Sequence, residues 1–79
     1  MICEGKLKRA AVTAAVDIAL RRMKKSPKRC ARNLMELGLC AYPDNLPAEN
    51  QEAFFQKLFD LIKKDDLQSA KELFSSVFL

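Results

Sequence analysis

The side chains that could do chemistry are concentrated in residues 21–32. This stretch holds seven basic residues, with Ser26 and Pro27 in its middle. Serine followed by proline is typical of a helix start, because serine can cap the helix and proline at the first helical position loses no needed N–H donor. The stretch therefore predicts a corner between two helices, with Lys28 and Arg29 in the first turn of the second. Positive charge there opposes the helix dipole, so these cations call for an explanation other than helix stability.

One explanation is an external anion. The free N–H groups of a helix start, the Ser26 hydroxyl and several cations together suit a phosphate or a carboxylate. The candidate anion- or nucleic-acid-binding residues are Lys24, Lys25, Ser26, Lys28, Arg29 and Arg32. The alternative is internal neutralisation, because an up-and-down bundle brings Asp65 and Asp66 to the same end as this corner. The sequence leaves both explanations open.

Other chemistry has little support in the sequence. The chain has no histidine and three cysteines, Cys3, Cys30 and Cys40, which cannot by themselves form a complete disulfide framework or a Cys/His zinc site. Cys30 is expected to be a small core residue, and no pair such as Cys40 with Asp44 has a spacing that implies a catalytic dyad. We expect no enzymatic activity, no cofactor and no metal site, and reduced thiols in a cytoplasmic protein.

The composition predicts a single all-α domain over residues 1–79. The chain is 49% hydrophobic and 30% charged, as in globular proteins, and it is too short for two domains. Two glycines and three prolines among many helix-forming residues, with no alternating apolar and polar window, favour helix over strand. The apolar stretch 10–20 is interrupted by Thr13 and Asp17 and is too short to span a bilayer, so neither membrane insertion nor secretion is expected.

Charge is unevenly distributed along the chain. The net charge is +4, but residues 1–40 carry ten basic and three acidic residues, whereas residues 41–79 carry four basic and seven acidic ones. Such asymmetry is typical of a protein with an acidic partner for its basic half, or of two halves that complement each other.

The elements that position these residues are predicted as a compact four-helix up-and-down bundle, with helices over about 5–25, 27–37, 47–64 and 67–78. Gly38 is expected to end the second helix in a left-handed conformation, and Pro43-Asp44-Asn45 to form a turn. The first helix is apolar around most of its middle, which predicts burial on several sides. The third helix is expected to contribute the largest share of the core; its apolar residues are Phe54, Phe55, Leu58, Phe59, Leu61 and Ile62.

The last residues form a second candidate surface. Val77, Phe78 and Leu79 close the sequence without a polar tail, so they either pack into the core or are covered by another subunit as an interface. Residues 58–74 resemble one helical hairpin of tetratricopeptide and pentatricopeptide repeats. There is no second copy at a fixed period, so the resemblance implies an αα-hairpin and no family.

Two functions follow from these patterns. The first is a small non-enzymatic helical interaction or regulatory module that binds a protein partner or a second copy of itself. The second is binding of nucleic acid or another polyanion through the basic corner, although the sequence lacks the aromatic motifs of the common RNA-binding modules.

Overall fold

Four α-helices make up the structure, a computed structural model that describes residues 9–79. They are α1 (Arg9–Met23), α2 (Pro27–Ala41), α3 (Ala48–Lys63) and α4 (Leu67–Phe78), with a short 3-10 helix, η1 (Pro43–Asn45), between α2 and α3. The described residues contain no strand, so the all-α class is confirmed. Residues 5–8 of the first predicted helix lie outside the described part.

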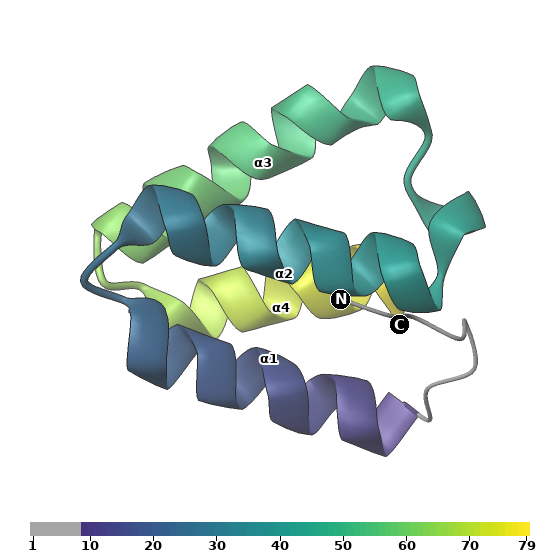
Figure 1. Ribbon diagram of the computed structural model, residues 1–79. Helices are drawn as coiled ribbons and strands as arrows, with labels where there is room; N and C mark the ends of the chain where they lie inside the picture. Colours follow the sequence, from purple (N-terminus) through teal and green to yellow (C-terminus); the bar gives the residue numbers. More distant parts are fainter. Residues whose placement is uncertain (1–8) are drawn as a thin grey trace.

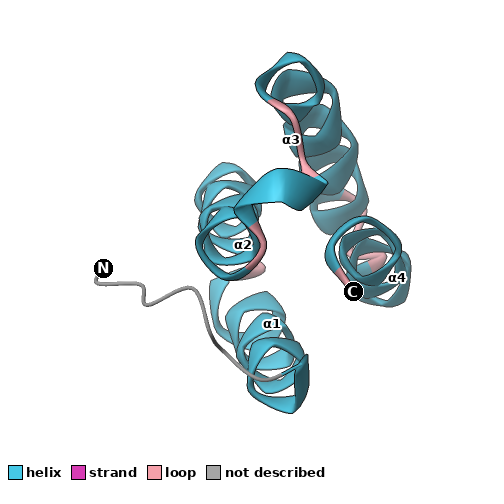
Figure 2. Ribbon diagram, turned by 90° about the vertical axis from the view of Figure 1, so that its right-hand side faces the viewer, coloured by secondary structure: helices cyan, strands magenta, loops and turns pink. Residues whose placement is uncertain are grey.

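The helices alternate in direction and form a compact bundle (Figure 1). Seen end-on, α2 and α4 lie in the middle, with α1 on one side of them and α3 on the other (Figure 2). The turn from α1 to α2 and the turn from α3 to α4 lie at the same end of the bundle, as the up-and-down arrangement requires. The basic corner and Asp65–Asp66 therefore share one end of the molecule.

Each outer helix buries one narrow stripe of side chains spaced by four residues. In α1 the stripe is Val12, Val16 and Leu20, and in α3 it is Phe54, Leu58 and Ile62. The expectation that the first helix is buried on several sides is wrong, because Ala11 and Ala14 are exposed and Ile18 is 50% exposed. Alanines make a helix read as apolar all round while contributing little area that needs burial.

The central helix α2, rather than α3, has the most buried residues. They are Cys30, Ala31, Leu34, Gly38 and Ala41. Most of them are small, which lets the neighbouring helices pack closely against α2 from both sides. Cys30 is fully buried, as predicted.

The prediction that Gly38 ends the second helix is wrong. The helix continues to Ala41, and Tyr42 N donates to Gly38 O at 2.7 Å at its end. Gly38 lies inside the helix, directly against the ring of Phe78, where a Cβ atom would overlap the ring carbons. The glycine is therefore explained by close packing and not by a left-handed backbone.

The other helix ends that fall within the described residues lie within two residues of the predicted ones. The first helix ends at Met23, so Lys24 and Lys25 lie in the turn and not in the last helical turn. Asp66 caps α4, with its Oδ1 accepting a hydrogen bond from Ser69 N at 3.3 Å. Asp65 has a positive φ of 62°, the left-handed conformation that closes this tight turn.

Candidate functional site

The basic corner is built around the start of α2. Ser26 is the residue before the helix, and its carbonyl accepts the first helical hydrogen bond, from Cys30 N at 2.9 Å. The Ser26 hydroxyl makes no capping hydrogen bond, and α2 has no acidic residue in its first turn. Lys28, Arg29 and Arg32 are all exposed. The sequence-based placement of these residues at one helix start is thus correct.

The first N–H groups of α2 are left open. Pro27 has no N–H, and the N–H groups of Lys28 and Arg29 have no hydrogen-bond acceptor within the described residues. These groups carry the positive end of the helix dipole. Neither Ser26 nor an acidic side chain covers them, so the corner has unused hydrogen-bonding capacity for a negatively charged group.

A groove of about 670 Å³ extends from this corner across to the end of α3. It is lined by Ser26, Pro27, Lys28, Arg29 and Arg32 from the corner and by Phe59 and Lys63 from α3. We call these seven residues the basic groove. Four of them are cations and none is an acid.

The two α3 residues of the basic groove were not predicted from the sequence. The sequence predicts Phe59 as a core residue, and Lys63 is not among the predicted site residues. Their addition to the site depends on how α3 packs beside α2, which no local pattern encodes. The alternating direction of the helices in an up-and-down bundle predicts only that α3 ends at the same end of the bundle where α2 begins.

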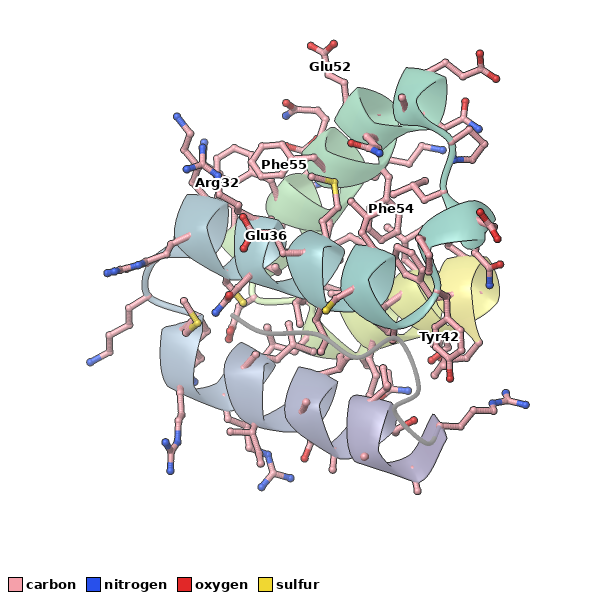
Figure 3. All side chains as sticks on the ribbon, turned by 45° about the vertical axis from the view of Figure 1, so that its right-hand side comes forward. Arg32, Glu36, Tyr42, Glu52, Phe54 and Phe55 are labelled. Carbon is pink, nitrogen blue, oxygen red and sulfur yellow. The ribbon has the colours of Figure 1, made fainter. Side chains whose placement is uncertain are left out.

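Phe59 is half-buried and has two close neighbours along α3. Its ring is parallel to that of Phe55, one turn earlier, with a centroid distance of 6.3 Å. The ammonium of Lys63, one turn later, lies 5.8 Å from the Phe59 ring centroid. In Figure 3, Arg32 projects outward from α2, whereas Phe54 points toward the interior and Glu52 away from the bundle.

The acids at this end of the bundle form no contact ion pair with the corner. Among residues 9–79 the ion pairs are Arg21 with Asp17 at 3.1 Å and Lys71 with Asp17 at 3.7 Å. Asp66 is engaged in capping α4. Neutralisation of the basic corner by direct pairing with Asp65 and Asp66 is therefore absent from the described residues.

One acid does lie on the other side of the arginines. A second hollow, of about 390 Å³, is lined by Met23, Arg29, Arg32, Asn33 and Glu36. Glu36 forms no ion pair with either arginine, and Asn33 instead donates to Met23 Sδ at 3.1 Å. The basic groove on the α3 side is the part of this surface without negative charge.

The three residues of the C-terminal candidate interface differ in burial. Phe78 is buried at 2% exposure, packed edge-on against Phe54 at 5.5 Å and against Phe74 at 4.9 Å between ring centroids. Its carbonyl accepts a hydrogen bond from Asn45 Nδ2 at 3.0 Å. Val77 and Leu79 are half-buried against the same core. Phe78 is therefore a core residue, and of the three candidate interface residues only Val77 and Leu79 remain accessible to a partner.

The cysteines offer no reactive group in the described part. Cys30 is a free thiol, but it is buried, and burial raises the pKa of this thiol. Cys40 is disulfide-bonded, so the expectation of reduced cysteines does not hold for it. Cys3 lies outside the described residues. Residues 9–79 contain no group of three His, Cys, Asp or Glu side chains that could hold a metal ion.

Comparison with known proteins adds no assignment: no family model, no curated protein and no solved structure matches this chain. Within residues 9–79, none of the helices combines the length and the apolar character needed to cross a membrane.

Proposed function

We propose that this chain is a small non-enzymatic helical interaction module, and that it binds a protein partner with the basic groove. The observation that carries the proposal is the meeting of four cations and a half-buried phenylalanine in one groove that no acid lines. Charge and apolar surface together are typical of protein recognition sites, where an anchor side chain fills a hollow and charged groups fix its orientation.

The energetics of the fold support this proposal. Lys28 and Arg29 lie at the positive end of the α2 dipole, and Lys28 and Arg32 are like charges one turn apart. Each such arrangement destabilises a helix by a few tenths of a kcal/mol. The fold would be more stable with acids at these positions, so their cations are better explained by something the protein binds.

A protein partner is favoured over nucleic acid by the surroundings of Phe59. Bases stack on free aromatic faces. The Lys63 ammonium lies over the Phe59 ring, 5.8 Å from its centroid, and therefore occupies one face of the ring. An apolar side chain can pack against a ring edge, whereas a base would have to displace Lys63.

Nucleic acid or another polyanion is the second candidate. It is favoured by the open N–H groups of Lys28 and Arg29, which suit a phosphate. This candidate predicts binding that weakens steeply between low and moderate salt and that does not depend on Phe59.

The two candidates separate in one cross-linking experiment. A diazirine side chain at Ser26, which lines the groove without contributing charge, is expected to form adducts with a protein partner in cells of the source organism. The matched control is a diazirine at Ala14, an exposed residue of α1 outside both candidate surfaces. Adducts at Ser26 alone that protease removes support the protein module, and an adduct of two chains identifies self-association.

The opposite results are equally clear. Adducts at Ser26 that nuclease removes would establish the polyanion candidate instead. Equal labelling from Ser26 and Ala14, or none from either, would remove the basic groove as a binding face.

A cytoplasmic location remains part of the proposal, and the disulfide at Cys40 counts against it, because disulfides persist mainly in oxidising compartments. Thiol-specific labelling of the protein in intact cells, followed by mass analysis without reductant, tests the location. An unlabelled, oxidised Cys40 would contradict a cytoplasmic protein, and a labelled one would support it.

A further inference from the structure

We infer that the basic groove binds a short acidic peptide segment anchored by one aromatic side chain. The inference rests on the proposed function and names the chemistry of the partner. It is argued from the charge of the groove, from its apolar surface and from its size.

The charge of the groove favours an anionic segment. Lys28, Arg29, Arg32 and Lys63 are exposed, and none of them forms an ion pair within residues 9–79. Two of them are arginines on one helix, whose planar guanidinium groups bind carboxylates through paired hydrogen bonds. An acidic segment would also relieve the repulsion between these four cations, which a neutral segment cannot do.

Because the groove also has an apolar surface, a segment that fills it needs an apolar side chain as well as negative charge. Pro27 and Phe59 are half-buried and line the same hollow as the four cations. A simple polyanion makes no use of these two rings. An aromatic side chain can pack edge-to-face against Phe59, and such pairs contribute about 0.5–1.5 kcal/mol beyond the burial of their area.

The size of the groove limits the length of the segment. Its volume of about 670 Å³ lies within the usual range of ligand-binding clefts, and the groove is open to solvent rather than enclosed. One large side chain with a few flanking residues fills such a space. A long helix or an extended domain surface would leave most of its own contacts outside the groove.

The test uses the purified full-length chain and fluorescein-labelled five-residue peptides. The first peptide has phenylalanine in the centre and two acidic residues on each side. Three comparison probes replace the phenylalanine by alanine, replace the acids by lysines, or replace the peptide by a single-stranded DNA pentamer. Binding is measured by fluorescence anisotropy, and the site is mapped by amide chemical shifts.

The acidic phenylalanine peptide is expected to shift the amides of the groove residues and to bind at least tenfold more tightly than each of the other three probes. The double variant Arg32→Glu with Lys63→Glu leaves two cations and two acids in the groove, so it is expected to bind this peptide at least tenfold more weakly than the parent chain does. The control Lys57→Glu, on the exposed surface of α3 outside the groove, should leave the preference unchanged. Circular dichroism of each variant verifies that it is folded.

Equal binding of the alanine peptide or of the DNA pentamer would overturn the inference in favour of a general polyanion site. A folded protein whose groove amides respond to no peptide would overturn it as well. These failures are distinguishable from failure of the proposed function: protease-sensitive adducts at Ser26 without peptide binding leave the module intact and reject only this partner chemistry.

Discussion

Gly38 of α2 lies so close to Phe78 of α4 that a Cβ atom built on the glycine would fall 2.5 Å from two of the ring carbons. Both residues are buried, Phe78 at 2% exposure, so neither can move aside into solvent. This contact fixes the distance between the two central helices and seats the end of the chain in the core.

The contact predicts that Gly38→Ala destabilises the protein, although alanine is the better helix former. Overpacking of a core costs about 1–3 kcal/mol, which exceeds the gain of about 1 kcal/mol in helix propensity. Chemical denaturation should therefore show a lower free energy of unfolding. Adding Phe78→Leu, which removes ring atoms at the contact, should recover part of the loss. An alanine variant as stable as the parent chain would show that the helices separate freely.

The two adjacent phenylalanines of α3 differ in environment from what the sequence suggests. Phe54 is 4% exposed, whereas Phe55 is half-buried beside Phe59. Phe54→Ala is expected to cost about 3–5 kcal/mol, as for buried phenylalanines, and Phe55→Ala clearly less. Thermal and urea unfolding of the two variants measure the difference. Equal losses would mean that Phe55 is as deeply buried as Phe54.

Several features of the fold follow from local patterns in the sequence. Ser26-Pro27 starts α2, and the four helices lie close to the ranges predicted from composition and apolar spacing. Each of these depends on residues within one or two turns of one another. For that reason a single sequence is enough to predict them.

Features that depend on contacts between distant residues could not be read in the same way. A glycine after an apolar helical stretch is typical of a helix end. The role of Gly38 is instead to leave room for the ring of Phe78, which is forty positions away in the sequence. The basic groove was half predicted: its α2 residues form one local cluster, while Phe59 and Lys63 come from the packing of α3. The sequence predicts either a core or an interface position for Val77, Phe78 and Leu79, because it does not show that Phe78 packs against Phe54 and Phe74.

Cys30 predicts a dependence of stability on pH. Burial raises the pKa of its thiol above the ordinary value, so the folded state holds the proton more tightly than the unfolded state. The resulting stability is fully present below the unfolded pKa of about 8.5 and is lost as the pH rises from there through the folded pKa. The difference in unfolding free energy between the parent chain and Cys30→Ala should therefore shrink in that window. A difference that stays constant to pH 10 would mean that the thiol ionises equally in both states.

Asp65 predicts a gain in stability from a glycine. Its φ of 62° is unfavourable for residues with a Cβ atom, although aspartate tolerates it better than most. Asp65→Gly removes this strain but makes the unfolded chain more flexible, so we expect a change within about 1 kcal/mol and in the stabilising direction. Asp65→Val, which tolerates positive φ poorly, should instead destabilise the protein by more than 1 kcal/mol. Urea unfolding ranks the three proteins, and a valine variant as stable as the glycine variant would contradict the left-handed turn.

The basic groove predicts a conflict between folding and binding at Lys28. Lys28→Glu replaces a cation at the positive end of the α2 dipole by an anion and removes one of four clustered charges, so it should stabilise the fold by about 0.5 kcal/mol at low salt. The matched variant Arg22→Glu places the same change in the last turn of α1, where the dipole favours cations, and should destabilise by a similar amount. Both effects should diminish in 1 M salt, because surface charges are screened. Lys28→Glu should also weaken binding of the acidic phenylalanine peptide at least tenfold, while Arg22→Glu leaves it within threefold. A Lys28→Glu protein that is less stable than the parent chain would show that the cation serves the fold, and would remove the argument that it is retained for a partner.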